Sequence, residues 1–190
     1  MVNIRVILNI LGLLLLIEGI SMLLPLGVAF YYNEGDIFAL AISAGLAITI
    51  GALSWLLTQR ADKTITKREG YIIVSIVWVM FSLFGSLPFV ISGEITSYTD
   101  AFFETISGFT TTGASILNDV ESIPHGLLFW RSMTQWLGGM GIIVLSLAIL
   151  PIFGIGGMQM FVAEVPGPTP DKFHPRVKET AKRLWGIYMI

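Results

Sequence analysis

The sequence predicts an all-α integral membrane protein in which a helix–pore loop–helix repeat follows an extra pair of transmembrane helices. Three observations lead to this fold class. The 190 residues are 54% hydrophobic and only 13% charged, and their mean hydropathy is +0.79, a balance foreign to soluble globular domains. Several apolar stretches are long enough to cross a bilayer. A threonine-rich segment that suits no ordinary helix stands between the last two of them.

The membrane spans follow from length and hydropathy. A spanning helix needs about 20 mostly apolar residues, because the hydrocarbon core is roughly 30 Å thick and each residue rises about 1.5 Å. A fifth apolar run begins near Leu184 and reaches Ile190, so we expect the chain to be the first part of a longer protein. The four complete stretches are Ile4–Phe30, Ile37–Leu57, Tyr71–Ile91 and Leu127–Phe153.

Basic residues mark one side of these spans. Arg5 lies at the N-terminal end of the first span, and further groups lie between the second and third spans and after the fourth. The links 31–36 and 92–125 contain no Lys or Arg and carry acidic residues. Because cytoplasmic loops are enriched in Lys and Arg, we expect a multi-pass protein with a cytoplasmic N-terminus and with the threonine run on the outer side. The two later groups are Arg60, Lys63, Lys67 and Arg68, then Lys172, Arg176, Lys178, Lys182 and Arg183.

These assignments divide the chain into four parts. Residues 1–69 form the N-terminal helix pair with its cytoplasmic link, and residues 70–153 form the first helix–pore loop–helix repeat. Residues 154–183 contain many Gly and Pro and are expected to form a second cytoplasmic link. Residues 184–190 would then begin a truncated second repeat.

Two features of the N-terminal helix pair concern its packing. Pro25 predicts a kink or an end in the first span, because proline removes one helical hydrogen bond. Small residues four positions apart in the second span predict close approach of another helix. These residues are Ala41, Gly45, Ala47 and Gly51.

A short helix is predicted before the threonine run. Ser97 or Thr99 can cap its start, and Asp100 in its first turn suits the positive end of the helix dipole. We expect the helix to reach about Ser107 and to close at Gly108 in the left-handed conformation. Such a helix covers about half of the hydrocarbon thickness, so its negative end would lie near the midplane and favour a cation there.

The run from Thr110 to Gly113 is the candidate ion site. It must return toward the outer surface without regular hydrogen bonds, which is tolerated at membrane depth only against protein or a water-filled cavity. The carbonyl groups of Thr110, Thr111, Thr112 and Gly113 can point at one axis, and glycine supplies the positive φ that an alternating arrangement needs. Oxygen ligands without a carboxylate suit a weakly held monovalent ion. The alternative is a periplasmic loop whose threonines are merely polar.

Charged residues in the apolar spans have a structural and a functional interpretation. Arg131 can pair with Glu104 on the short helix and brace the hairpin, or it can reach the lipid headgroups. Glu18 lies inside the first span, where an ionisable group is costly enough to suggest a function, although a packing role outside the pore is equally compatible.

His125 is interpreted as an interfacial loop residue. The residues Trp78, Trp130 and Trp136 are interpreted as packing or interface anchors.

Three motifs resemble those of one transporter superfamily. They are FETISGFTTTGASI at Phe103–Ile116, FWRSMTQWLGGMGIIV at Phe129–Val144 and FVAEVPGPTPDK at Phe161–Lys172. They are similar to the Trk/Ktr/HKT superfamily of potassium transporters, and most of all to its bacterial TrkH-type membrane subunit. The resemblance implies repeats of the helix–pore–helix kind, four in number, around one pore. It also implies a homodimer and a cytosolic nucleotide-binding regulatory ring of the TrkA kind.

The expected function is potassium uptake across the bacterial inner membrane through a filter of backbone carbonyls, of which this chain supplies one of four segments. K+ would be the transported ion, with no cofactor bound by the chain and no nucleic-acid partner. The alternative is a less selective channel for K+ and Na+ assembled from short subunits. An intramembrane enzyme is disfavoured because HExxH and GxSxG motifs are absent from the sequence. A non-transporting membrane scaffold is the third class.

Overall fold

The computed structural model describes residues 3–59, 67–152 and 186–188, and the regular structure within them is helical. The all-α prediction is therefore confirmed for this part of the chain. The link 154–183, most of the predicted basic groups and most of the second-repeat start lie outside the described residues. The helices are α1 (Ile4–Ser21), α2 (Leu23–Tyr32), α3 (Ile37–Thr58), α4 (Lys67–Gly85), α5 (Leu87–Ser92), α6 (Tyr98–Phe109) and α7 (His125–Ile152).

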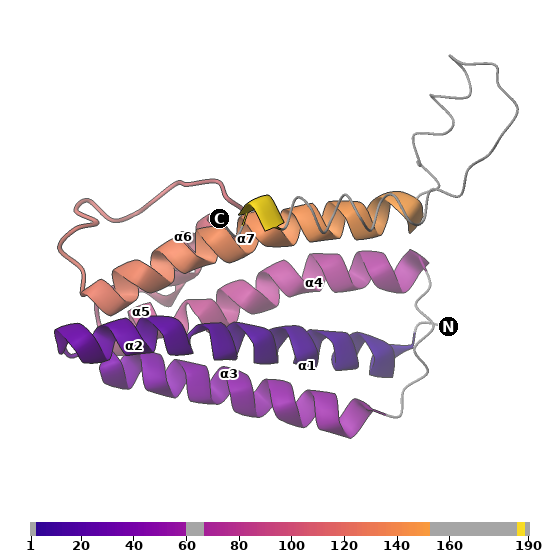
Figure 1. Ribbon diagram of the computed structural model, residues 1–190, viewed down its shortest axis with the longest axis horizontal. Helices are drawn as coiled ribbons and strands as arrows, with labels where there is room; N and C mark the ends of the chain where they lie inside the picture. Colours follow the sequence, from indigo (N-terminus) through magenta and orange to yellow (C-terminus); the bar gives the residue numbers. More distant parts are fainter. Residues whose placement is uncertain (1–2, 60–66, 153–185, 189–190) are drawn as a thin grey trace, which may run out of the picture. The chain divides into compact units, whose positions relative to one another are not determined.

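The chain forms two compact units, Met1–Gly138 and Gly139–Ile190. The second unit contains the latter part of α7 and a helical stretch at residues 186–188. All contacts described below lie within the first unit. In that unit α1, α3 and α4 lie side by side, and α6 packs against α4 (Figure 1).

Three helical segments of the described residues are long and apolar enough to cross a membrane. They are Ile4–Tyr32, Ile37–Thr58 and Glu69–Ser92, and they coincide with the first three predicted spans. The fourth predicted span coincides with α7, whose side chains are described as far as Gly141. The protein is thus an integral membrane protein built from apolar helices.

The first and third spans are each interrupted near a proline. The first breaks at Met22, three positions before Pro25, where the sequence predicts a kink. The third breaks at Ser86, two positions before Pro88, and this break was not predicted. There the Phe89 N–H donates to the Ser86 carbonyl at 3.2 Å. The Gly85 carbonyl, which Phe89 would reach in a continuous helix, instead accepts from Trp130 Nε1 at 2.8 Å. An aromatic side chain thus satisfies a backbone group that the break releases.

Glycine allows α1 and α3 to approach each other closely. A Cβ atom at Gly51 would lie 2.6 Å from the backbone nitrogen of Leu16 and 2.8 Å from the carbonyl oxygen of Gly12. Ala47, one turn earlier, is fully buried. The predicted small-residue contact at Ala47 and Gly51 therefore faces α1. The contact predicted at Gly45 is wrong for the described residues, because a Cβ there would meet no atom within 4 Å.

One apolar core joins the N-terminal helix pair to the later helices. Its largest fully buried side chains include Trp130, Phe89 and Phe109, and the ring of Phe109 meets that of Trp130 edge to face with centroids 6.4 Å apart. The core therefore fixes α6 and the start of α7 against α2, α3 and α5. Its buried members are Met22, Ala29, Leu40, Ala44, Phe89, Ile95, Ala101, Phe109, Leu127, Trp130 and Met133.

The α1–α3 contact leads to a stability prediction. We expect Gly51→Ala to lower the free energy of unfolding by about 1–3 kcal/mol, because the added methyl group meets backbone that cannot turn aside. The matched control is Gly45→Ala on the same helix, which adds the same group in open space. Thermal unfolding of the purified protein in detergent measures both variants. Equal melting temperatures for the two variants would contradict the packing described here.

Candidate functional site

Helix α6 begins where the sequence predicts. The Ser97 side chain is the N-cap and accepts from the backbone N–H of Asp100 at 3.4 Å. Asp100 lies in the first turn, where its charge suits the helix dipole. The helix has 12 residues, which span roughly 18 Å and so more than half of a hydrocarbon core.

The predicted end of this helix is wrong. Gly108 is helical and buried, and the helix continues through Phe109. The left-handed residue is Thr111, with φ +56°. Its N–H donates to the Gly108 carbonyl at 2.9 Å, and the Thr112 N–H donates to the Ser107 carbonyl at 2.9 Å. This pair of bonds is a Schellman motif, which usually places glycine where Thr111 stands.

Gly108 serves a different purpose, which is contact with α7. A Cβ atom at Gly108 would collide with the hydroxyl group of Thr134 on that helix. Gly138, one turn further along α7, would likewise collide with the carbonyl group of Phe109 if it carried a side chain. The two glycines therefore let the end of α6 rest directly on α7. The sequence pattern around Gly108 predicts a backbone conformation for this glycine and does not indicate its contact with α7.

After α6 the chain returns as a limb without regular structure, the return limb (residues 110–124). Gly113 has φ +77°, and among the described residues one atom lies within 4 Å of an added Cβ, Gln135 Nε2 at 3.9 Å. Within the described part of the chain, no hydrogen bond ends on the carbonyl groups of residues 110–113. Residues 111–116 are all exposed in this chain. These carbonyl groups are therefore free to bind an ion.

The hydroxyl groups of Ser107, Thr110 and Thr112 at this turn form hydrogen bonds within the protein. Thr110 Oγ1 donates to the Ile106 carbonyl at 2.7 Å and lies 2.8 Å from Thr112 Oγ1. Ser107 Oγ donates to the Ala114 carbonyl at 2.6 Å. Side-chain oxygens thus tie the limb to α6, whereas the backbone oxygens between Thr110 and Gly113 stay open.

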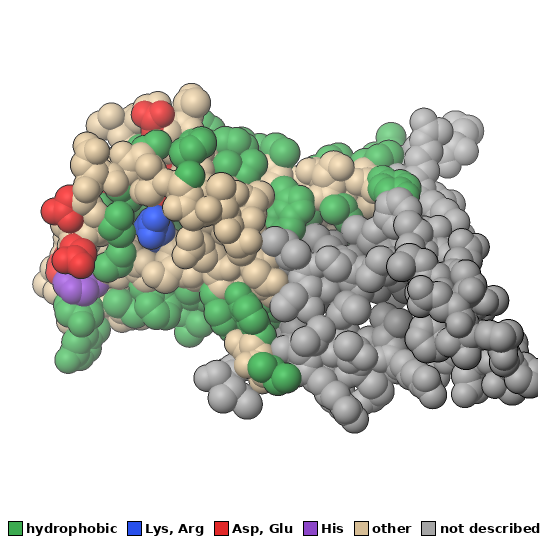
Figure 2. All heavy atoms as spheres, turned by 90° about the horizontal axis from the view of Figure 1, so that it is seen from above, with side chains coloured by type: hydrophobic (Ala, Val, Ile, Leu, Met, Phe, Trp, Pro, Cys, Tyr) green, Lys and Arg blue, Asp and Glu red, His purple; other side chains and the backbone are tan. Residues whose placement is uncertain are grey.

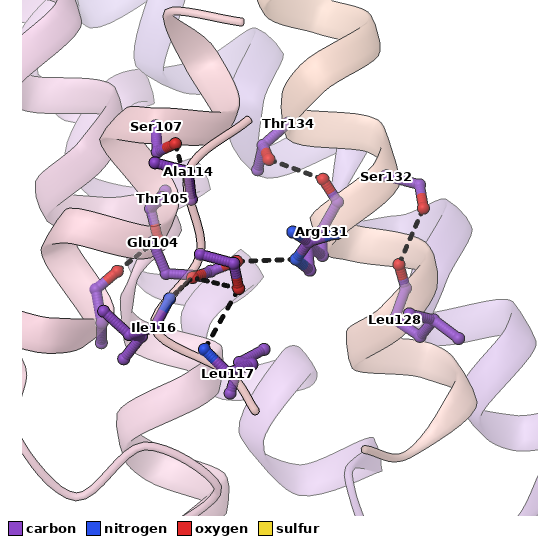
Figure 3. A network of polar contacts seen from close by, with 12 residues as sticks. Glu104, Thr105, Ser107, Ala114, Ile116, Leu117, Leu128, Arg131, Ser132 and Thr134 are labelled. Carbon is purple, nitrogen blue, oxygen red and sulfur yellow. Dashed lines mark hydrogen bonds and ion pairs between the residues drawn. The ribbon is translucent and has the colours of Figure 1, made fainter. Parts of the chain in front are cut away.

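Glu104 holds the next part of the limb (Figure 3). Its carboxylate accepts from Arg131 Nε at 2.7 Å, from the Ile116 N–H at 3.0 Å, and from Ser115 Oγ at 3.0 and 3.1 Å. Glu104 is 3% exposed, and the Arg131 side chain is 19% exposed. The structure therefore brings these two residues together, on α6 and α7, with the limb between them.

Glu18 and the tryptophans also take defined positions. Both Glu18 carboxylate oxygens are buried and have no partner among the described residues. A Cβ atom at Gly85 would lie 3.0 Å from Glu18 Oε1 and 2.9 Å from Thr105 on α6. The Glu18 carboxyl group and α6 therefore both lie next to Gly85. Trp130 is fully buried in the apolar core and donates to the Gly85 carbonyl, so the packing interpretation is confirmed for this residue and the interface interpretation is not.

His125 is not a loop residue, contrary to the interpretation from sequence. It is the first residue of α7, and its backbone N–H donates to Glu34 Oε2 at 2.7 Å. Its ring nitrogen Nδ1 lies 2.8 Å from Glu34 Oε1. Donation from the His125 backbone lowers the pKa of the Glu34 carboxyl, and the ring contributes further. Sequence reasoning missed this contact because no local pattern links residues 91 positions apart.

Within the described residues, no group of three or more His, Cys, Asp or Glu side chains could hold a metal ion. The oxygens without a hydrogen-bond donor at the turn after α6 are the backbone carbonyls of residues 110–113. Oxygens of this kind suit monovalent cations, because divalent ions prefer carboxylate ligands.

Comparison with known proteins decides the family. The family model described as "TrkH: Cation transport protein" matches residues 37–190. This chain belongs to the TrkH family. The Trk system potassium uptake protein TrkH of Salmonella typhimurium is 47% identical over 188 residues, which are 98% of this chain and 39% of that protein. TrkG of Escherichia coli K12 is 37% identical over 190 residues, 99% of this chain and 39% of that protein.

The fold agrees with a TrkH crystal structure. The potassium transporter TrkH from Vibrio parahaemolyticus matches with a TM-score of 0.82 and 40% sequence identity, over 99% of this chain and 37% of that one. The superfamily resemblance drawn from the sequence motifs is thus confirmed. The chain spans about 39% of the length of the TrkH relatives it matches.

The left-handed Thr111 leads to a second stability prediction. A side chain in this conformation costs about 1–2 kcal/mol, more than the roughly 0.5–1 kcal/mol that glycine loses through its freedom in the unfolded chain. We therefore expect Thr111→Gly to raise the melting temperature. The control is Thr110→Gly, which removes a residue at φ −82° together with its bond to Ile106 and should lower the melting temperature. Destabilisation by both variants would show that Thr111 is unstrained.

Proposed function

We propose that this chain supplies one of four segments of a potassium filter built from backbone carbonyls, in a protein that takes up K+ across the bacterial inner membrane. The observation that carries the proposal is the turn from Thr110 to Gly113, whose carbonyl groups accept no hydrogen bond from the described residues. The names of the relatives, which are potassium uptake proteins, support K+ as the ion.

The geometry of α6 favours a cation at this turn. The carbonyl end of a helix carries partial negative charge, and the free carbonyls begin directly after that end. Irregular backbone with unpaired carbonyls is costly in lipid, but it is stable where it faces a hydrated path or a bound ion. Such oxygens replace the hydration shell of K+ without holding the ion permanently.

Glu104 and Arg131 brace this filter segment in our proposal, and Gly108 lets the segment rest on α7. Because Glu104 accepts from three different donors across the limb, its carboxylate fixes residues 115 and 116 relative to α6. A tether at this point limits how far the carbonyls of residues 110–113 can move.

The organisation of the whole protein is also a proposal. The relatives are longer than this chain, which supports a single polypeptide with three further filter segments. It does not favour the alternative, a less selective K+/Na+ channel assembled from four copies of a short subunit. Within this chain, residues 1–69 would be the extra helix pair and residues 70–153 the first repeat. The acidic link 92–125 would face outward, with the N-terminus in the cytoplasm. The family resemblance supports a homodimer that docks on a cytosolic nucleotide-binding ring of the TrkA kind.

Gly113 provides the test of the filter assignment. We expect Gly113→Ala in the full-length protein to reduce Rb+ uptake at least about tenfold, because an L side chain at φ +77° distorts the backbone that presents the carbonyls. The matched control is Gly93→Ala, which places the same group at φ +84° in open space at the end of α5. Gly93→Ala should keep the uptake per molecule. Undiminished uptake by the Gly113 variant would refute the assignment.

The brace is tested by neutralising its two charges. Arg131→Gln leaves the buried Glu104 carboxylate without its cation, which typically costs about 3–5 kcal/mol. We therefore expect Glu104→Gln to restore part of the stability and the Rb+ uptake that Arg131→Gln removes. A charge swap is unsuitable, because an arginine at position 104 cannot accept from the Ile116 N–H. Additive losses in the double variant, measured by thermal unfolding and uptake, would argue against the brace.

A further inference from the structure

The loop between α2 and α3 lies against the first turn of α7. Asn33 ends α2 in the left-handed conformation, with φ +54°, and Gly35 has φ +92°. These two positions turn the chain on either side of Glu34. Acidic side chains and a histidine gather at one end of the described part of the molecule (Figure 2).

Two carboxylates of this loop cap α7. The His125 N–H donates to Glu34 Oε2 at 2.7 Å, and the Leu127 N–H donates to Asp36 Oδ2 at 3.1 Å. The first N–H groups of a helix have no partner within it and carry partial positive charge. Capping side chains usually come from the residues just before the helix. Here they come from residues 91 positions earlier in the chain.

The Asp36 contact is buried and closely fitted. Asp36 is 1% exposed, and Leu127 is fully buried. A side chain at Gly126 would collide with Asp36 Oδ2, so only glycine at position 126 admits the carboxylate. The ring of His125 stacks on that of Tyr32, with centroids 3.9 Å apart and planes 3° apart. Tyr32 and Glu34 thus hold the same histidine from two sides.

We propose that Glu34 and Asp36 form an acidic clasp. The clasp is a pair of positioning residues that determines the course of the return limb and thereby the positions of the carbonyl groups of residues 110–113. The limb is irregular and largely exposed, so its path depends on where its two ends are held. Glu104 and Ser107 hold the end beside α6. The acidic clasp holds the other end, because the limb runs directly into the first turn of α7. This inference rests on the proposed function.

The clasp stands on a rigid base. Loop 33–36 joins α2 to α3, and α3 is held against α1 by the backbone contacts at Gly51. Leu40, one turn into α3, is fully buried in the same core as Leu127 and Trp130. The extra helix pair therefore fixes the clasp in the same apolar core that holds α6. In this role the pair controls the ion path without lining it.

The experiment uses the full-length protein with Asp36→Ala, Asp36→Asn and Glu34→Ala, and with Glu94→Ala as the control. Glu94 is an exposed acid on link 92–125, and among the described residues its side chain makes no hydrogen bond or ion pair with α7, so its loss changes the net charge equally without touching the clasp. Hydrogen exchange measures the mobility of residues 110–128, independently of transport. Competing Rb+ and Na+ uptake per molecule in vesicles measures the filter.

We expect Asp36→Ala to speed exchange in the limb and to lower the Rb+/Na+ uptake ratio roughly tenfold, which corresponds to about 1.4 kcal/mol. Asp36→Asn keeps an acceptor for the Leu127 N–H and should recover part of the ratio. Glu34→Ala should have a smaller effect, because the Glu34 pair is more exposed, and Glu94→Ala should match the wild type.

Two results overturn the clasp. One is unchanged limb exchange in Asp36→Ala, whatever the uptake. The other is a wild-type ion ratio in the Asp36→Ala molecules that remain folded, which would reduce the contact to a purely structural one. Failure of the proposed function gives a different result, which is equal Rb+ uptake by the wild type and by Gly113→Ala. In that case the positioning role of the clasp is refuted together with the filter assignment.

Discussion

Carbonyl groups at the end of a helix have no partner within the helix, and the described part of this chain holds one such set of carbonyls in a defined turn after α6. The Schellman motif satisfies the carbonyls of Ser107 and Gly108. The carbonyls from Thr110 to Gly113 then follow without donors among the described residues. The transition from paired to free oxygens is therefore abrupt, and it falls at the negative end of α6.

Keeping such a turn in one conformation requires support from its surroundings, because a β-branched residue at positive φ does not hold that shape unaided. Thr111 is fixed by the bonds of its neighbours and by the close contact of α6 with α7. Polar contacts from Ser107 and Glu104 then hold the limb that follows. The strained residue and the groups that support it lie close together in the chain, at the place where ion contact is proposed.

Sequence reasoning succeeded where the signal is local. Length and hydropathy located the spans, and Ser97 marked the start of α6. It failed where the role of a residue is determined by its contact with a segment that is distant in the sequence. Gly108 was assigned to a helix end because glycine favours positive φ, yet the Thr134 hydroxyl on α7 decides its identity. The break at Ser86 was missed for a similar reason, since its stability depends on Trp130.

The same reasoning explains why the N-terminal helix pair carries a buried acid at Asp36. A buried carboxylate is costly unless it is hydrogen-bonded, and here it accepts from the first turn of α7. An apolar residue would pack as well, but it would leave the Leu127 N–H buried and unpaired, which is also costly. The acid therefore satisfies the Leu127 N–H through Oδ2, while Oδ1 of the same carboxylate is buried without a hydrogen-bond partner among the described residues. It also requires that α3 and α7 meet at one register, because only Gly126 leaves room for the carboxylate. The contact thus specifies the register at which the start of α3 meets the start of α7, which apolar packing alone would not specify.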